Sequence, residues 1–194
     1  MRRIHGPLGA LLAAGCLAAG GIAGAQEPQF TVSVDERSGD VRGPLDVVRV
    51  ALGPTGEGRL RGEITTAQAW DTEDLRAASG AGSVCLRLFT RRSPDAEPPD
   101  YLVCATPAAT GDGLVGRVLR DRANGLPRTV AEATITRPTT RSIFLRFPTR
   151  VIGNPARVRF GAETVTRGSG CGSLRGCVDT APDAPSTARL RLAG

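Results

Sequence analysis

The chain has 194 residues, a formal net charge of +6 and only 4% aromatic residues. Its 25 residues of the Lys and Arg class are all arginine, and its one histidine, His5, lies in an N-terminal segment that we expect to be removed. A mature chain without His or Lys lacks the commonest general base, the imine-forming amine and the main nitrogen ligand of metals. This excludes a Ser-His-Asp triad, and scattered arginines with few aromatics argue against a nucleic-acid surface.

Residues 1–25 predict a secretory signal peptide. Arg2 and Arg3 provide a positive start, residues 8–22 are almost wholly apolar and small, and residues 23–25 read Ala-Gly-Ala, an A-x-A cleavage pattern. The apolar run is too short and too rich in Gly and Ala for a membrane span, which needs about 20 strongly apolar residues. We therefore expect export without a membrane span.

Lipid attachment is the alternative fate of this N-terminus. A lipoprotein would be cut before Cys16, although the apolar run continues beyond that residue and favours the later cut. Cleavage after residue 25 leaves residues 26–194, a length that fits one domain of ordinary size.

Short apolar or alternating segments, separated by Gly, Pro and Asp, follow one another along the mature chain. Period-two alternation with Val-rich runs is typical of strands, and residues 53–56, Gly-Pro-Thr-Gly, predict a turn between two of them. One short helical turn is expected after Asp71, a suitable capping residue. The pattern predicts an all-β fold, an antiparallel β-sandwich of jelly-roll or immunoglobulin-like type with at most one short helix. The expected strands are 30–34, 45–52, 60–65, 84–90, 101–105, 113–119, 129–136, 142–147 and 156–164.

Four cysteines remain after cleavage, namely Cys85, Cys104, Cys171 and Cys177. An even number in an exported chain predicts disulfides, and three pairings are open. We favour Cys85–Cys104, which would join two neighbouring strands, and Cys171–Cys177, which would close a Gly-rich loop. A zinc site is disfavoured because the spacings are not C-x₂₋₄-C and no histidine is present.

Acidic residues near the two ends of the domain are candidate calcium ligands. Asp35, Asp40 and Asp46 lie in or beside Gly-containing turns, and carboxylates in such turns suit a hard cation. The spacing is not that of an EF-hand, so we favour aspartates that accept hydrogen bonds from backbone N–H groups. Asp179 would join the same site only if the two ends of the domain meet in space. Calcium is the only cofactor that the sequence suggests.

Trp70 is the one tryptophan and, with Tyr101, one of two large aromatics with a polar edge. It is a candidate contact for a ligand such as a sugar ring. Equally, Trp70 follows an expected strand and would then close one end of the core, where Trp→Ala costs about 3–5 kcal/mol.

A few short motifs resemble those of secreted DOMON-like and family-9 carbohydrate-binding-like β-sandwiches. These motifs are Gly39-Asp40, then Gly43-Pro44-Leu45-Asp46 before a Val-rich strand, Ile152-Gly153-x-Pro155, and Asp179-x-x-Pro182. The resemblance implies an extracytoplasmic recognition or accessory domain. Haem-binding members of that group use Met or His as iron ligands, and sugar-binding members clamp a sugar between tryptophans. The mature chain has neither Met nor His and only one Trp.

The first functional hypothesis is a secreted, non-catalytic recognition domain whose target is an envelope polysaccharide or another protein. A small hydrolase is the alternative, because two carboxylates about 5–10 Å apart suffice for glycosidase chemistry and acid pairs such as Glu73-Asp74 are present. A structural envelope component is the third hypothesis, and an unprotected sheet edge or a large apolar patch would favour it.

Overall fold

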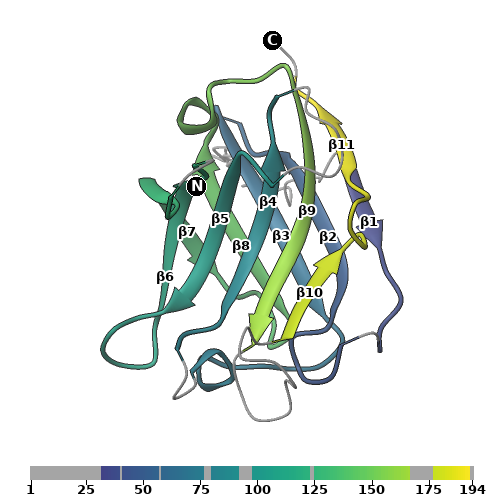
Figure 1. The fold of residues 1–194 in the computed structure, drawn as a ribbon, viewed down its shortest axis with the longest axis vertical. Coiled ribbons are helices and arrows are strands. Elements are labelled where there is room, and N and C mark those ends of the chain that lie inside the picture. Colours follow the sequence, from purple (N-terminus) through teal and green to yellow (C-terminus); the bar gives the residue numbers. More distant parts are fainter. Residues whose placement is uncertain are drawn as a thin grey trace, which may run out of the picture.

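The structure is a computed structural model that describes residues 32–39, 41–56, 58–76, 80–91, 98–122, 125–166 and 177–192. Eleven strands and two short 3₁₀ turns make up the described fold (Figure 1). They are β1 (Val32–Asp35), β2 (Val47–Pro54), β3 (Arg59–Thr66), η1 (Glu73–Leu75), β4 (Ser83–Phe89), β5 (Tyr101–Pro107), β6 (Leu114–Arg120), β7 (Arg128–Thr136), β8 (Ser142–Pro148), η2 (Thr149–Ile152), β9 (Arg157–Thr166), β10 (Cys177–Ala181) and β11 (Ala188–Arg191).

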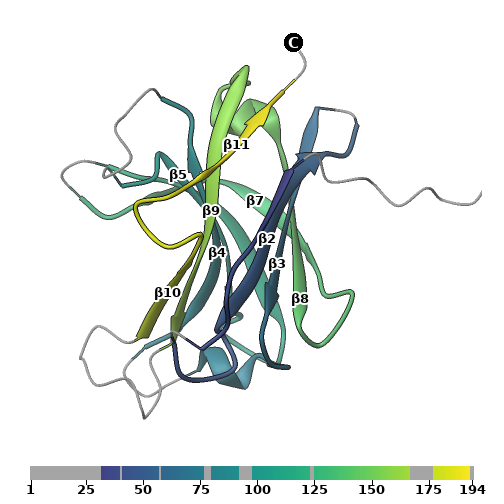
Figure 2. The same cartoon turned by 90° about the vertical axis from the view of Figure 1, so that its right-hand side faces the viewer.

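All strand pairs are antiparallel, in the order β1-β2-β3-β8-β7-β6-β5-β4-β9-β10, and β11 also pairs with β9. The meander β4–β8 therefore lies between β3 and β9. Strand β7 belongs to two sheets, because Arg128–Ala133 pair with β6 and Thr134–Thr136 pair with β8. We call the sheet of β1, β2, β3 and β8 the first sheet, and that of β6, β5, β4, β9, β10 and β11 the second sheet. Figure 2 shows the two as facing layers.

The core lies between the two layers and follows from the alternation of side chains along each strand. In β11, for example, Ala188 and Leu190 are buried whereas Arg189 and Arg191 are exposed. The largest fully buried side chains come from both sheets, from η1 and from the β1–β2 connection: Phe147, Phe160, Leu45, Leu52, Leu60, Ile64, Leu75, Leu86, Leu88, Ile143, Leu145 and Leu190. A side chain at Gly62 would displace Leu86 of the facing layer, because a Cβ atom at this position would lie 2.8 Å from a Leu86 methyl group.

The structure confirms the predicted all-β, antiparallel, two-layered fold. Each of the nine expected strands corresponds to a strand of the structure with ends shifted by a few residues, and the 53–56 turn joins β2 and β3 into the expected hairpin. Strands β10 and β11 and the turn η2 were not predicted. Within the described residues no helix is long and apolar enough to cross a membrane. The expected signal peptide and Cys16 lie outside the described residues.

Candidate functional site

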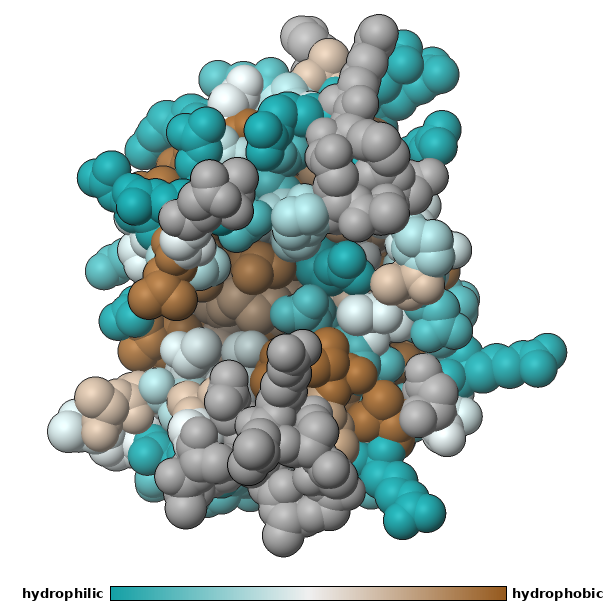
Figure 3. All heavy atoms as spheres, in the orientation of Figure 1, coloured by the Kyte–Doolittle hydropathy of each residue, from teal (hydrophilic) through white to brown (hydrophobic). Residues whose placement is uncertain are grey.

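The outward-facing side of the second sheet, which we call the outer face, is the candidate site. Its apolar members point away from the core on strands β4, β5, β6, β9 and β10. Only Val178, at the margin, has half of its surface exposed. The apolar members are Leu102, Val115, Leu119, Val165, Val178 and the Cys85–Cys104 disulfide. Figure 3 views this face and shows brown atoms around a shallow hollow between hydrophilic margins. A solvent-facing apolar area with a polar rim is typical of an interaction surface.

An ion pair lies near the middle of the outer face. Arg87 of β4 is directly opposite Gly161 of β9, and Glu163 is two residues further along β9. The Nε of Arg87 is 4.0 Å from the carboxylate Oε2 of Glu163, and the two side chains are only 13% and 26% exposed. Within the described part of the chain, Arg87 Nε is buried without a hydrogen-bond partner. A half-buried charge pair that is too long for a hydrogen bond is an expensive arrangement for a sheet surface.

Burial also changes the acid chemistry of this pair. Loss of water around the carboxyl group raises the pKa of Glu163, and the guanidinium of Arg87 offsets that rise only in part. The charged group that faces Glu163 is the guanidinium of Arg87, whereas a glycosidase needs a second carboxylate in this place.

Phe89 extends the site along β4. Its ring is 3% exposed and lies beneath two guanidinium groups, with Arg87 5.5 Å and Arg159 5.2 Å from the ring centroid. Cation–π contacts of this kind hold long arginine side chains flat against a sheet. Both arginines are thus fixed in position across strands β4 and β9.

The predicted Cys85–Cys104 disulfide is confirmed and crosses the outer face. The two cysteines are directly opposite each other on β4 and β5, with a Cα–Cα distance of 4.0 Å. Cys85 also lies opposite Glu163 of β9. Cys177 is disulfide-bonded as well, and Cys171, its expected partner, lies outside the described residues.

The outward side of the first sheet carries polar contacts and a cation–π contact of its own, with the guanidinium of Arg61 4.2 Å from the ring centroid of Phe144. Asp35 pairs with Arg49 at 3.0 Å, and the hydroxyl groups of Thr65 and Ser142 are hydrogen-bonded at 3.0 Å. The three exposed large apolar side chains among the described residues, Leu126, Val130 and Val178, all belong to strands of the second sheet, to β7 beside it or to the β6–β7 connection. These three side chains therefore lie outside β1, β2, β3 and β8.

The candidate calcium residues are divided between different places. Asp35 forms the surface ion pair described above, and Asp40 lies outside the described residues. Asp46 and Asp179 are brought together: both are buried, Asp46 Oδ2 accepts from the N–H of Gly39 at 2.7 Å, and Asp179 Oδ2 accepts from the N–H of Val47 at 2.6 Å. The two ends of the domain thus do meet.

These contacts agree with the favoured interpretation, in which the aspartates accept from backbone N–H groups. Among the described residues no group of three or more His, Cys, Asp or Glu is arranged to hold a metal ion. The observed hydrogen bonds assign both carboxylates a structural task, and we favour this role over calcium binding.

Trp70 closes the end of the core instead of lying on the surface. It is 4% exposed and packs with the core residues, and its backbone N–H donates to the carbonyl of Thr140 at 3.1 Å. The guanidinium of Arg137 stacks 3.9 Å from the centroid of the indole rings and also donates to the Trp70 carbonyl. This burial matches the role of closing one end of the core and does not match the role of a ligand contact.

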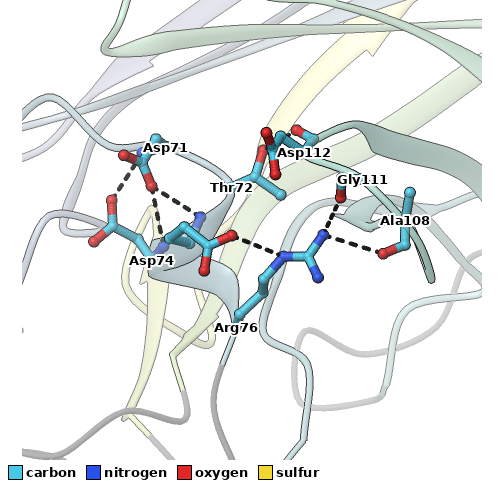
Figure 4. A network of polar contacts seen from close by, with 8 residues as sticks. Asp71, Thr72, Asp74, Arg76, Ala108, Gly111 and Asp112 are labelled. Atoms are coloured by element: carbon cyan, nitrogen blue, oxygen red, sulfur yellow. Dashed lines mark hydrogen bonds and ion pairs between the residues drawn. The ribbon is translucent and has the colours of Figure 1, made fainter.

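The acid pair Glu73-Asp74 has structural partners. Asp71 Oδ1 accepts from the N–H of Glu73 at 2.8 Å, Asp74 Oδ2 accepts from the N–H of Asp71 at 2.8 Å, and Glu73 pairs with Arg76 at 3.2 Å. Asp71 thus accepts hydrogen bonds from N–H groups of the predicted turn, whose N-cap residue is Thr72. Arg76 and Thr72 then fasten the turn to carbonyl groups of the β5–β6 loop, at Ala108, Gly111 and Asp112 (Figure 4).

Asp100 is a buried carboxylate that sequence analysis did not single out. It precedes β5 and accepts from the N–H groups of Thr90 at 2.7 Å and Arg91 at 3.0 Å, and the guanidinium of Arg91 contacts it as well. Burial opposes ionisation of Asp100, but these donors outweigh it and lower the pKa of the carboxyl group. Asp100 thus fixes the end of β4 against the start of β5.

No protein-family model, no curated protein and no solved structure matches this chain. A disulfide-bonded β fold without a membrane-spanning helix in its described part is compatible with an extracytoplasmic location.

Proposed function

We propose that this protein is an exported, non-catalytic recognition domain that binds a component of the cell envelope across the outer face. The observation that supports this most directly is the combination of half-buried apolar side chains with the Arg87–Glu163 pair on a sheet surface that no further described layer covers. Recognition surfaces combine apolar area with a few placed polar groups in this way. The DOMON-like resemblance of the sequence is consistent with the proposal.

The engagement of the acidic residues supports a non-catalytic role. Asp46, Asp179, Asp71 and Asp74 accept hydrogen bonds from backbone N–H groups, and Glu163 faces an arginine. Carboxylate-dependent hydrolysis needs two acids that flank a scissile bond. An accessory or recognition domain needs only a stable surface of suitable shape and chemistry.

Retention on purified envelope material tests the proposal. The oxidised protein, residues 26–194, would be mixed with the insoluble envelope fraction of the producing cell and sedimented. We expect retention of the wild-type protein and reduced retention of Val178→Asp, which places a charge on the 50% exposed member of the apolar surface. Thr134→Asp is the matched control, because Thr134 is an exposed residue on the outward side of the first sheet.

Three results would contradict the proposal. The first is absence of retention of the wild-type protein on any envelope fraction. The second is equal retention of Val178→Asp and wild type together with loss in Thr134→Asp. The third is hydrolysis of an envelope glycan that is abolished by Glu163→Gln, which would favour the enzyme hypothesis instead.

A further inference from the structure

The hairpin of β6 and β7 carries exposed apolar residues at its end. Two of the three exposed large apolar side chains of the described chain belong to it: Leu126, in the connection between the strands, is 87% exposed, and Val130 of β7 is 40% exposed. Pro127, which lies between them in the sequence, is exposed as well. A single exposed leucine is ordinary on a protein surface, but here exposed apolar residues are grouped at one end of one hairpin.

The exposure of Val130 coincides with a β-bulge. Across the β6–β7 pair, Thr129 lies opposite Leu119 and Ala131 lies opposite Val118, which leaves Val130 as the extra residue. The extra residue of a bulge has no partner in the ladder, and bulges re-aim side chains beside functional surfaces. Strand β7 thus presents an apolar side chain to solvent near the end of the hairpin.

Three arginines flank these apolar residues. Arg120, the last residue of β6, is directly opposite Arg128, the first residue of β7, and Arg122 follows β6 by two positions. A Cβ atom at Gly125 would lie 4.0 Å from the Cδ of Arg122, so the stem of this side chain runs beside the residue that precedes Leu126. All three arginines are exposed, and within the described part of the chain none of them forms an ion pair or a side-chain hydrogen bond. Like charges directly opposite each other destabilise a strand pair, so an anion at this place would stabilise it. We call Arg120, Arg122, Leu126, Arg128 and Val130 the hairpin tip.

The same end of the fold carries further arginines. The pairing registers place the start of β3, the end of β8, the start of β9 and the end of β11 at the end of the two sheets that also holds the β6–β7 connection. Of the acids that the structure describes at this end, Asp100 is buried against Arg91 and Asp121 is half-buried. Positive charge therefore predominates among the described residues of this end, and such a charge distribution orients a protein toward an anionic surface. The exposed arginines of this end that form no ion pair with a described residue, in addition to those of the hairpin tip, are Arg59, Arg150, Arg157 and Arg191.

The combination of an exposed leucine with exposed guanidinium groups fits a lipid surface better than a polysaccharide or a nucleic acid. An interfacial membrane site places apolar side chains at the boundary of headgroups and acyl chains, and basic side chains on anionic headgroups. Guanidinium groups bind phosphate in a bidentate manner, and phospholipid headgroups carry phosphate. A hydrated polysaccharide offers Leu126 no apolar phase, and stacking of bases needs aromatic side chains, which make up only 4% of the chain.

We propose that the hairpin tip docks the exported protein on an anionic phospholipid surface. Leu126 and Val130 enter the boundary between headgroups and acyl chains, while Arg120, Arg122 and Arg128 bind lipid phosphates. Figure 2 shows the β6–β7 connection projecting from the fold on the side of the second sheet, at the left of the view. Docking therefore holds the outer face near the lipid surface. This inference goes beyond the proposed recognition function, because it concerns a different part of the molecule and a different ligand.

Binding to vesicles of defined composition tests the docking. The oxidised protein would be sedimented with phosphatidylcholine vesicles that contain or lack phosphatidylglycerol, at low and at physiological salt. We expect binding only to the anionic vesicles, and weaker binding as the salt concentration rises. Leu126→Asp should bind on the order of tenfold more weakly, because a charge replaces an apolar side chain at the boundary. Arg122→Gln/Arg128→Gln should also bind on the order of tenfold more weakly, because two headgroup contacts are lost.

Matched variants keep the test specific. Arg37→Gln/Arg42→Gln removes the same charge from exposed positions between β1 and β2, at the opposite end of the strands, and should retain wild-type binding. Arg122→Lys/Arg128→Lys retains the charge and should bind more tightly than the corresponding glutamine variant. All of these positions are exposed, so thermal unfolding should show that each variant is folded.

A tryptophan at the hairpin tip gives a direct readout of insertion. Trp70 is buried at the opposite end of the fold, so its fluorescence should not respond to vesicles. In Leu126→Trp/Trp70→Phe the single indole lies at the tip, and anionic vesicles should shift its emission to shorter wavelength and brominated lipid should quench it. Leu126→Trp alone, with Trp70 as a constant background, gives the same readout if the double variant is unstable. Unshifted and unquenched emission from vesicle-bound protein would overturn the proposal.

Three further results would overturn the docking proposal. They are equal vesicle binding of Leu126→Asp and wild type, an equal loss of binding in Arg37→Gln/Arg42→Gln and in the hairpin variant, and tighter binding to polygalacturonate or double-stranded DNA than to anionic vesicles at physiological salt. The recognition function is tested separately, because delipidated envelope material should retain Leu126→Asp as well as wild type, and Val178→Asp should bind vesicles as well as wild type. Loss of envelope retention with intact vesicle binding refutes only the recognition function, and the converse refutes only the docking.

Discussion

The carboxylate of Asp179 accepts a hydrogen bond from the backbone N–H of Val47 at 2.6 Å and thereby joins the two margins of the sheet. Val47 begins β2 in the first sheet, and Asp179 lies in β10 of the second sheet, 132 positions later. A second contact reinforces this seam, because the buried hydroxyl of Thr164 donates to the carbonyl of Leu45 at 2.7 Å. Side-chain hydrogen bonds thus join the two margins of the sheet, in place of the backbone hydrogen bonds that would pair them as neighbouring strands.

Replacement of Asp179 by alanine should destabilise the protein by about 1–3 kcal/mol, since the buried N–H of Val47 is left without its acceptor. Urea unfolding at neutral pH measures the change. Asp183→Ala, at an exposed position in the next turn, should leave the unfolding midpoint close to that of wild type. An unchanged midpoint in Asp179→Ala would show that the seam is not held by this contact.

Calcium should not raise the melting temperature of the wild type, because the carboxylates of Asp46 and Asp179 already accept hydrogen bonds from backbone N–H groups.

Asp100 should make stability fall in acid. Its pKa in the folded protein is lower than the ordinary 3.8, so its contribution is fully present above that value and is lost as the pH falls through the folded pKa. In Asp100→Asn the free energy of unfolding should be lower at neutral pH and should change less between about pH 5 and pH 2. Asp112→Asn, at an exposed position, serves as the control. Parallel acid limbs for wild type and Asp100→Asn would contradict the prediction.

Glu163 should have the opposite effect. Because burial raises its pKa above the ordinary 4.5, the folded protein holds this proton longer than the unfolded chain does. Stability from this group is therefore greatest below pH 4.5 and decreases as the pH rises through the folded pKa. Glu163→Gln should flatten the pH dependence in that window, as measured by chemical unfolding at closely spaced pH values. Glu132→Gln, at an exposed position opposite Arg117, should not flatten it.

Trp70→Phe should lower the melting temperature but leave retention on envelope material unchanged. The indole is 4% exposed and supports Arg137 at the end of the core, so its replacement affects packing and leaves the outer face as it is. Differential scanning calorimetry and the sedimentation assay measure the two properties. A variant with wild-type stability and lost retention would return Trp70 to the role of a ligand contact.

The sequence predicts those parts of the fold that depend on local alternation and turn residues. The β2–β3 hairpin and the β4–β5 pair with its disulfide follow from period-two patterns and from Gly53 and Gly56. Strand β11 has the same signal, since Ala188-Arg189-Leu190-Arg191 alternates, but it is short and follows two prolines at 182 and 185. Such short segments are difficult to separate from a terminal loop.

The candidate site depends on strand order, which local patterns do not encode. Arg87 and Glu163 become neighbours only because β9 pairs with β4 across the intervening meander, and Arg159 meets Arg189 only because β11 folds back on β9. Asp46 and Asp179 could be named as candidates from residue type and turn context. Their meeting depends on how the two margins of the sheet come together, and the burial of Trp70 likewise depends on the assembled core.

The position of β11 also has a consequence for the time at which the protein folds. Strand β1 packs beside β11, and both β10 and β11 pair with β9 (Figure 1). During synthesis or translocation, β1 therefore gains its contacts with β11 only after the last strand has emerged. Contacts of such long sequence separation form slowly. A chain of this topology cannot complete its fold while it is being translocated, and this late folding suits the export that we propose.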